Sequence, residues 1–284
     1  VPENIRVIID TLFVKNAKVS LDKLNLRHRH YIKSEKYKGE IHFSTGSNTS
    51  RSSSNFYALN NGIATLFEIR GVGIGKTSFK RRINSGLAVG FSFLKTAFEN
   101  SNFIFNQIDV ANTNTNDIVL QHERSIYTDV IKVIDIESNE LIDFTTTMHS
   151  SKDSYAISKR DRPLAYIIKK NNYGFIDKLD DVGVKYVEFE RDTMIYSGGY
   201  KVVEFNNNFK VYEKMKMQKV VTSIEYGNNK FSKGDILISM NQKRSNLIAE
   251  LLEPEAPNSY VSFGIIKTSL NKQLPIYRIK NFNN

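Results

Sequence analysis

The chain of 284 residues contains no cysteine, so it forms neither disulfides nor metal sites with thiolate ligands. It also lacks any run approaching the roughly 18 apolar residues of a membrane-spanning helix, and we expect no such helix. The sequence does not begin with methionine, and no charged-then-apolar leader opens it. We therefore expect a processed or truncated product whose signal peptide, if there is one, was removed or lies upstream. These absences leave the compartment open between an exported, periplasmic location and the cytoplasm.

The chain is basic, but its positive charge is not concentrated. It has 40 Lys and Arg against 30 Asp and Glu, which gives a net charge of +10. The two densest basic clusters, Arg27–Lys38 and Lys76–Arg82, are short, and elsewhere acidic residues are interleaved with basic ones. This distribution is more typical of a solvated basic surface than of a nucleic-acid interface, so we predict no nucleic-acid partner.

The first hundred residues have the pattern of two helices with strands between them. Apolar residues recur at helical spacing from Pro2 to Leu24 and again from Thr77 to Asn100. Glu40–Ser44 alternates as a strand does, and Gly62–Phe67 is a short apolar run bounded by glycine, which indicates a buried strand. We expect the phenylalanines of the second helix to be core residues and this helix to cover a sheet.

Glu68 directly follows the predicted strand Gly62–Phe67, and a turn with three glycines comes after it. Strand, turn and helix form the unit from which α/β sheets are built, and such sheets place their chemistry at the carboxyl ends of strands. Glu68 is therefore the first candidate for a functional residue. The alternative is a buried carboxylate paired with Arg70, which alternation places on the same face.

The glycines of that turn do not form a nucleotide-binding motif. Gly71, Gly73 and Gly75 precede Lys76-Thr77, but Arg70 stands where a phosphate-binding loop has its first glycine. The dinucleotide pattern G-x-G-x-x-G also fails, because the third glycine comes one residue early. We interpret the glycines as a sharp turn that uses positive φ angles.

Three stretches carry a resemblance to a known family. Residues 67–82, FEIRGVGIGKTSFKRR, resemble the segment of zinc metallocarboxypeptidases that holds the catalytic glutamate, as written in a bacterial subgroup with a C-terminal accessory domain. Residues 1–32 resemble the helix and strand between the second zinc-ligand motif and that segment, and residues 234–264, with AELLEPEAPNS, are similar to the tail of the same subgroup. The resemblance covers nearly the whole chain and is weak between residues 100 and 230.

This resemblance implies roles for three residues. Glu68 falls on the glutamate that takes a proton from a zinc-bound water and returns it to the leaving amine. Asn55 falls on an asparagine that faces the substrate, while Ser54 stands where the family has an arginine. The nearest arginine is Arg51, whose planar fork is suited to a substrate carboxylate. The alternative for Arg51 is a solvent-exposed loop residue.

The metal-binding part of the family is not found in this sequence. None of the five histidines is followed three residues later by glutamate, and in the resembled subgroup both ligand motifs precede the part that matches residues 1–32. We therefore expect zinc in the intact enzyme, none in this chain alone, and an N-terminal portion that supplies the metal as a separate chain or a missing segment. One other metal site stays open, because four residues of ligand type share the faces of two strands. They are His28, His30, Glu40 and His42.

Beyond about residue 100 the pattern changes to strands. Polar Asn/Thr-rich sequence leads into β-type alternation in most of the remaining chain, with a helix at Ser245–Leu252 that Pro254 ends. We predict an α/β fold in which residues 1–102 are the C-terminal part of a carboxypeptidase-like mixed-sheet catalytic domain. A β-rich α+β accessory domain with mostly antiparallel pairing would follow at residues 105–284.

Two functions fit these observations. The first is the C-terminal portion of a zinc-dependent metallocarboxypeptidase that hydrolyses C-terminal peptide bonds and is inactive without the part that supplies zinc. The second is a non-catalytic descendant that binds peptide or cell-wall material without cleaving it. Peptide is the expected ligand in the first case. The sequence gives neither the side-chain preference nor the oligomeric state.

Overall fold

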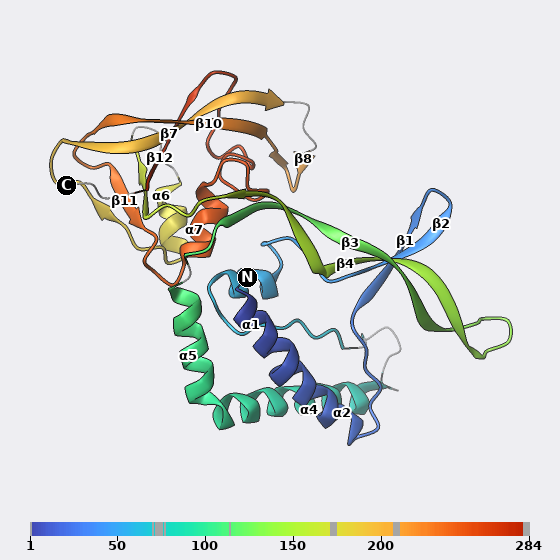
Figure 1. Ribbon diagram of the computed structural model, residues 1–284. Helices are drawn as coiled ribbons and strands as arrows, with labels where there is room; N and C mark the ends of the chain where they lie inside the picture. Colours follow the sequence, from blue (N-terminus) through green and yellow to red (C-terminus); the bar gives the residue numbers. More distant parts are fainter. Residues whose placement is uncertain are drawn as a thin grey trace.

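Helices gather at one end of the molecule and a β-sheet at the other. The computed structural model describes residues 2–69, 71, 76, 78–113, 115–170, 175–206 and 211–280. Within them, helices and strands are mixed, which confirms the predicted α/β class. A long hairpin, β3 (Ile118–Ile134) with β4 (Leu141–Arg160), extends from the C-terminal sheet past the N-terminal helices (Figure 1).

The predicted N-terminal helix is confirmed, with one irregular turn. It consists of α1 (Glu3–Ile8), the π-helical turn η1 (Ile9–Val14) and α2 (Lys15–Asp22) in one continuous run. The wider π turn accommodates a step of five residues between buried Ile8 and buried Phe13, which an α-helix would place on different faces. The π turn thus keeps the buried side chains of α1, η1 and α2 on one face.

The second predicted helix is present and is followed by another. The helix α4 (Phe79–Glu99) ends at Asn100, where the chain turns into α5 (Ser101–Asn112). The Asn100 side-chain amide donates to the Thr96 carbonyl at 2.9 Å, which satisfies one acceptor at the end of α4. Phe93 of α4 packs on Phe13 with ring centroids 5.1 Å apart, and this contact joins α4 to the N-terminal helix.

The prediction that the phenylalanines of α4 are core residues is wrong for most of them. Phe93 points into the helical cluster, but Phe79, Phe91 and Phe98 are exposed. The helix has apolar side chains on two faces, and in the described structure only one of these faces packs on neighbouring elements. Helical spacing identified the apolar faces correctly, but it does not say which of them a neighbour covers.

The predicted buried strand at Gly62–Phe67 is also wrong. After α3 (Ser53–Leu59), Asn61 adopts a left-handed conformation with φ of 56°, and residues 62–69 continue without regular secondary structure. The segment lies along α4 instead of in a sheet, because Phe67 packs edge-on against Phe93 at 5.2 Å. A strand needs an adjacent strand for its backbone hydrogen bonds, and no described strand lies beside this run. Apolar character alone could not supply that neighbour.

A four-stranded sheet combines strands from both predicted domains. Its order is β1-β2-β4-β3, where β1 (Ile32–Tyr37) and β2 (Glu40–Thr45) form a hairpin. The strand β2 confirms the expected strand at Glu40–Ser44, and it pairs in parallel with β4. All other strand pairs described are antiparallel, as predicted for the C-terminal part. The division into units at 1–102 and 105–284 stays a prediction.

The main hydrophobic core lies under the C-terminal sheet of order β10-β7-β12-β5-β11-β6. The helix α7 (Ser245–Leu252) begins and ends where the sequence indicated, and it packs its apolar side against this sheet. No helix in the described part of the chain is long and apolar enough to cross a membrane. The remaining elements of this half are α6 (Ile176–Asp181), β5 (Ala165–Ile168), β6 (Val187–Glu188), β7 (Thr193–Asn206), β8 (Val211–Tyr212), β9 (Met215–Lys216), β10 (Lys219–Phe231), β11 (Ile236–Ser239) and β12 (Gln273–Ile279).

Candidate active site

Glu68 lies on the irregular segment that runs along α4, and its side chain is exposed. Its neighbours Leu66 and Ile69 are also exposed, although they are apolar. A Cβ added to Gly86 of α4 would meet the end of the Ile69 side chain at 3.6 Å, so the segment crosses α4 at that glycine. Glu68 is therefore an exposed carboxylate beside apolar side chains that the described residues leave exposed, not a buried carboxylate at a strand end as predicted.

The suggested partner of Glu68 falls outside the described residues. This partner is Arg70, and Gly73 and Gly75 of the predicted turn also lie outside the described residues. The alternative in which Glu68 is paired with Arg70 therefore stays a hypothesis.

Asn55 stabilises the loop that precedes α3. Its side-chain amide donates to the carbonyl oxygens of Ser47 at 2.7 Å and Thr49 at 2.9 Å. Both donor hydrogens of the amide are thereby used within the loop. Asn55 shapes this loop, and its role toward a substrate stays a prediction.

Arg51 lies on the same loop and binds the C-terminal half of the chain. Its guanidinium forms an ion pair with Glu213 and lies over the rings of Tyr212 at 4.5 Å and Phe263 at 5.1 Å. These contacts combine charge pairing with cation–π attraction. Arg51 is thus an exposed loop residue, as the alternative had it, and its side chain also links the loop to the β8–β9 hairpin.

No hydrogen bond in the described structure joins the three sequence-predicted residues, and their grouping into one site stays a prediction. Asn55 lies in the first turn of α3 and Arg51 in the loop before it, and neither is hydrogen-bonded to Glu68 in the described structure. Spacing along the chain had placed Asn55 relative to Glu68 on the assumption of a strand at 62–67. That strand is absent, so the spacing loses its geometric meaning.

The four residues of the alternative metal site do not converge on one point, although His42 contacts Glu40. His28 contacts Asp22 at 2.9 Å, and His30 contacts the Lys18 amine at 3.2 Å. The described residues contain no group of three or more His, Asp or Glu side chains arranged to hold a metal ion. The residues present thus do not fit a zinc site.

His42 instead contacts a histidine that sequence reasoning had not paired with it. Its Nδ1 lies 3.0 Å from Nε2 of His149, and the two rings are stacked at 29°. The pair arises because β2 and β4 run in parallel, with His42 opposite Thr147. On the other side of the ring, Nε2 of His42 lies 3.4 Å from a carboxylate oxygen of Glu40. The two ring nitrogens of His42 therefore point to different partners and not to one common point.

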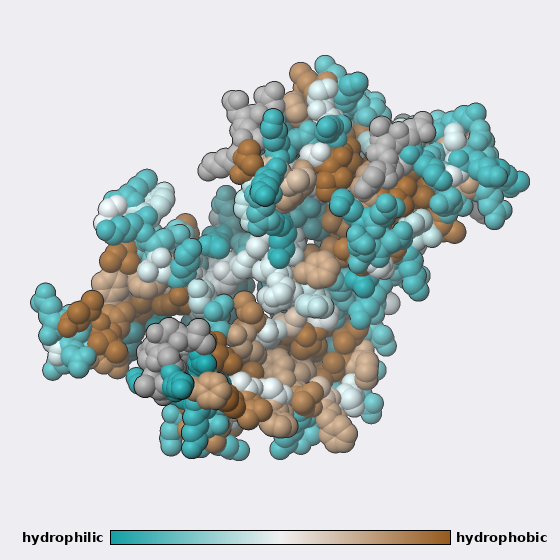
Figure 2. Space-filling view, turned by 180° about the vertical axis from the view of Figure 1, so that it is seen from behind, coloured by the Kyte–Doolittle hydropathy of each residue, from teal (hydrophilic) through white to brown (hydrophobic). Residues whose placement is uncertain are grey.

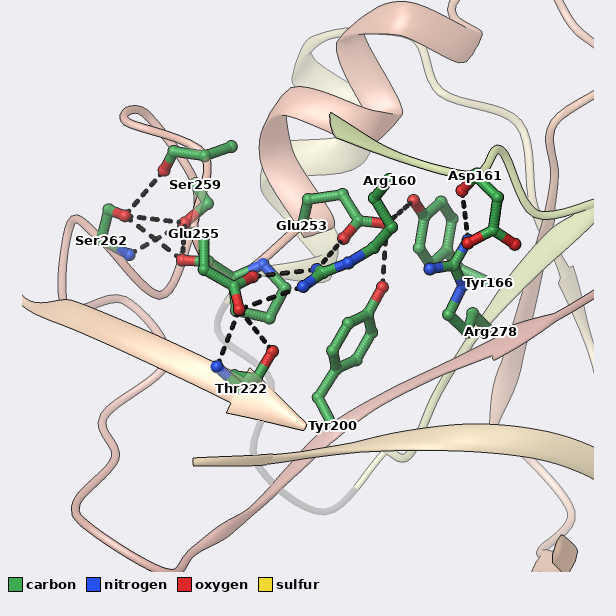
Figure 3. A network of polar contacts seen from close by, with 12 residues as sticks. Arg160, Asp161, Tyr166, Tyr200, Thr222, Glu253, Glu255, Ser259, Ser262 and Arg278 are labelled. Atoms are coloured by element: carbon green, nitrogen blue, oxygen red, sulfur yellow. Dashed lines mark hydrogen bonds and ion pairs between the residues drawn. The ribbon is translucent and has the colours of Figure 1, made fainter. Parts of the chain in front are cut away.

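A buried network of charged and polar groups lies at the end of α7 (Figure 3). Glu253 is fully buried, and one of its oxygens accepts from the hydroxyls of Tyr166 at 2.5 Å and Tyr200 at 2.8 Å. Its other oxygen accepts from Arg160 at 2.5 Å. Arg160 also donates to both oxygens of Glu255, at 2.9 and 3.1 Å. Both oxygens of Glu253 are thus occupied, and the group acts as a buried counter-charge.

The pKa values in this network shift in the direction expected for compensated buried charge. Burial alone would lower the pKa of Arg160, but hydrogen bonding to Glu255 and the charge of Glu253 outweigh it and raise the pKa. Burial and the charge of Glu253 raise the pKa of the Tyr166 hydroxyl well above its usual value. The pKa of the Tyr200 hydroxyl rises for the same reasons. The tyrosines therefore stay protonated and can donate to Glu253.

This buried network of charged groups was not predicted from the sequence, although the stretch that contains two of them was named above. The stretch AELLEPEAPNS contains Glu253 and Glu255 on either side of Pro254, directly after an apolar helix. Two carboxylates that follow a buried helix are a signal for paired internal charge, because a buried charge is retained only with partners. Arg160, which both carboxylates bind, lies 93 or more positions away in the sequence. The sequence therefore could not identify it as their partner.

Comparison with known proteins finds relatives named for one activity. The chain is 28% identical to carboxypeptidase 2 of Trichophyton equinum and 27% identical to carboxypeptidase 2 of Trichophyton tonsurans. Each match covers 99% of this chain and 53% of the relative. Carboxypeptidase 2 of Trichophyton rubrum matches at 28% identity with the same coverage. No protein-family profile matches the chain, and no solved structure does.

The chain is thus related to proteins named carboxypeptidase over its whole length, and it spans about half of theirs. This supports a partial carboxypeptidase-like region. The relatives are fungal, so they give no support to the bacterial subgroup that the resemblance suggested.

Proposed function

We propose that this chain is the C-terminal portion of a zinc-dependent metallocarboxypeptidase that hydrolyses C-terminal peptide bonds. The observation that supports the proposal most is Glu68, an exposed carboxylate in the segment that resembles the catalytic stretch of that family. The carboxypeptidase names of the relatives agree with it. In this proposal residues 1–102 belong to the catalytic domain and residues 105–284 form the accessory domain.

Glu68 would move the proton of the reaction. A carboxylate within hydrogen-bond reach of an attacking water accepts its proton, and the resulting acid then protonates the nitrogen of the departing amino acid. An exposed side chain on a segment without regular structure is free to approach such a water. In the structure no partner from the described residues occupies the Glu68 carboxylate.

Zinc ligands must come from elsewhere in this proposal, since the described residues provide no set for them. A portion that carries the ligands, either as a separate chain or as a preceding segment, would complete the site. This chain alone would then be inactive.

Arg51 would have to exchange partners to bind a substrate carboxylate. It is held by Glu213 and two aromatic rings, so a peptide would compete with the Glu213 carboxylate for the same guanidinium. Asn55 would act by fixing the loop on which Arg51 lies. A Glu213→Ala variant of the active protein should lower KM if Arg51 binds the substrate.

The occupied state of Arg51 and Asn55 favours a second candidate function. If both stay engaged within the chain, the protein binds peptide or cell-wall material without turnover. Peptide binding that is independent of zinc and unaffected by Glu68→Gln would select this alternative.

The deciding experiment uses the native protein that contains this chain, isolated at the length the cell makes and supplied with zinc. Hydrolysis of an N-acylated dipeptide is measured for the unmodified protein, Glu68→Gln and Glu99→Gln. Glu99 is the matched control because it is an exposed glutamate at the end of α4 whose partner is a surface lysine. We expect Glu68→Gln to lower kcat by about a thousandfold or more, while Glu99→Gln stays within about twofold.

Absence of any zinc-dependent hydrolysis by the native protein would overturn the proposal. Full activity of Glu68→Gln would overturn the role of Glu68 even if hydrolysis is found.

A further inference from the structure

The helix α4 has a second apolar face that nothing in the described structure covers. One face, with Val89, Ser92 and Thr96, is buried against the N-terminal helix. The other has large apolar side chains at steps of three and four residues along the entire helix, and we call it the open face of α4. Its members are Phe79, Ile83, Leu87, Phe91, Leu94 and Phe98.

The open face is too extensive for an ordinary surface. Phe91 is 66% exposed, Leu94 69% and Phe98 85%, and the six side chains follow a helix of 21 residues, about 31 Å long. Isolated exposed apolar residues are common, whereas a contiguous stripe of this length marks an interaction surface. Seen from behind, apolar residues gather along the end of the molecule where α4 and α5 lie (Figure 2).

A glycine in the middle of the open face indicates a close partner. Gly90 lies between Leu87 and Leu94 on the same side of the helix, and an added Cβ there would meet no atom within 4 Å. Glycine in a helix interior costs roughly 1 kcal/mol relative to alanine, and this fold gives no steric reason for it. A partner whose backbone or side chain approaches α4 at Gly90 would provide that reason.

The segment that carries Glu68 borders this face. Ile69 reaches α4 at Gly86, one turn before Gly90, and its own side chain is 40% exposed. A partner that packs on the open face at Gly90 would therefore lie within about one helical turn of the point where the Glu68 segment meets α4. The two features belong to one continuous surface.

We infer that the open face of α4 is the docking surface for the portion of the carboxypeptidase that supplies the zinc ligands, through an apolar face of that portion. This inference rests on the proposed function. The unmatched half of the relatives' length is a candidate of sufficient size, and docking at Gly90 would bring a ligand set next to Glu68. A second copy of this chain would also bury the face, but its described residues bring no ligand set to Glu68.

Site-specific photo-crosslinking in the native protein tests this assignment. A benzoylphenylalanine replaces Phe91, and in a control it replaces Ile136, an apolar residue outside α4 that is 94% exposed near the turn between β3 and β4. After irradiation, mass spectrometry identifies the crosslinked peptides. We expect the label at position 91 to react with a sequence outside residues 1–284, in the polypeptide that carries a His-x-x-Glu motif.

Charge variants provide a second readout. Phe91→Asp with Leu94→Asp should reduce retained zinc by about tenfold or more, whereas Ile136→Asp should change it by less than about twofold. Gly90→Leu should act like the double variant, because it blocks the close approach. All these positions are exposed, so the helical circular dichroism of the chain itself should stay unchanged.

The inference would be overturned if position 91 crosslinks to another copy of residues 1–284 or to a polypeptide without the His-x-x-Glu motif. A crosslinking yield at position 91 no higher than at position 136 would also overturn it. Zinc-dependent hydrolysis without the expected crosslink would refute the docking surface and leave the proposed function standing. The expected crosslink without zinc-dependent hydrolysis would refute the proposed function and leave the docking surface standing.

Discussion

The two ends of this molecule treat their apolar residues differently. In the C-terminal half, the residues of β5, β11 and β12 that face the core are almost completely buried between the sheet and α7. In the N-terminal half, α4 buries one apolar face and leaves the other in contact with solvent. The C-terminal sheet thus completes its own core, while the helical end has apolar surface that the described residues leave uncovered.

Polar groups show the same contrast. Glu253 in the C-terminal half has three donors within 2.8 Å, and the charges around it are paired. Glu68 in the N-terminal half is exposed beside apolar side chains. A carboxylate with all its acceptors occupied serves stability, and one with free acceptors is available for chemistry. The two ends thus differ in how many partners the described residues give to their carboxylates.

The largest effect on stability should come from the buried network. We expect Glu253→Ala to lower the free energy of unfolding by about 3–5 kcal/mol, because Arg160 and two tyrosine hydroxyls lose their acceptor in the interior. Urea denaturation measures this. Glu225→Gln is the control, since Glu225 forms a surface pair with Lys201 and should cost less than about 1 kcal/mol. A loss of under 1 kcal/mol for Glu253→Ala would mean that water fills the site.

The two faces of α4 should respond unequally to truncation. Phe93→Ala removes a half-buried ring that packs on Phe13 and Phe67, so we expect it to cost about 2–3 kcal/mol. Phe98→Ala removes a ring that is 85% exposed and should change stability by less than about 0.5 kcal/mol in the chain alone. Thermal unfolding of the two variants side by side gives the difference. Equal losses would show that the open face is covered within the chain.

A glycine of the C-terminal sheet should be sensitive to a single methyl group. An added Cβ at Gly199 in β7 would lie 2.4 Å from the Gln273 amide and 2.8 Å from the Tyr277 ring. We expect Gly199→Ala to cost about 1–3 kcal/mol through this overpacking. Gly227→Ala in the adjacent strand β10 meets no atom within 4 Å and should be neutral or slightly stabilising. Chemical denaturation of both variants measures the two stability changes. Equal changes would mean that the side chains of Gln273 and Tyr277 can move away from position 199.

The smallest effect concerns acid stability. Burial would raise the pKa of Asp161, but Lys280 at 3.0 Å and the charge of Arg278 outweigh it and lower the pKa below 3.8. The unfolded chain then binds the proton more readily, so this contribution is complete above pH 3.8 and is lost as pH falls through the folded value. Solvent screening limits it to less than about 1 kcal/mol, and Asp161→Asn should flatten the stability curve in that window. The same pH dependence of the unfolding free energy in the unmodified chain and in Asp161→Asn would contradict a lowered pKa of Asp161.

Much of the secondary structure follows from the sequence by itself. Helical spacing located the N-terminal run, α4 and α7, and alternation located β2 and most strands of the C-terminal half, because these periods reflect which side of an element is apolar. In the turn between β3 and β4, Asn139 has a positive φ of 56°, a conformation that asparagine tolerates better than most residues. Local geometry and local preference agree in all these places.

Only the tertiary structure decided how those elements meet. The apolar run at Gly62–Phe67 has the composition of a strand, yet it has no strand to pair with and lies along α4. The pairing of His42 with His149, and of Glu253 with Arg160, depends on contacts between residues about a hundred positions apart. The sequence determined which residues are apolar, which are charged and how each element is shaped. Which apolar face is covered, and which carboxylate stays free, depends on what lies next to it in space.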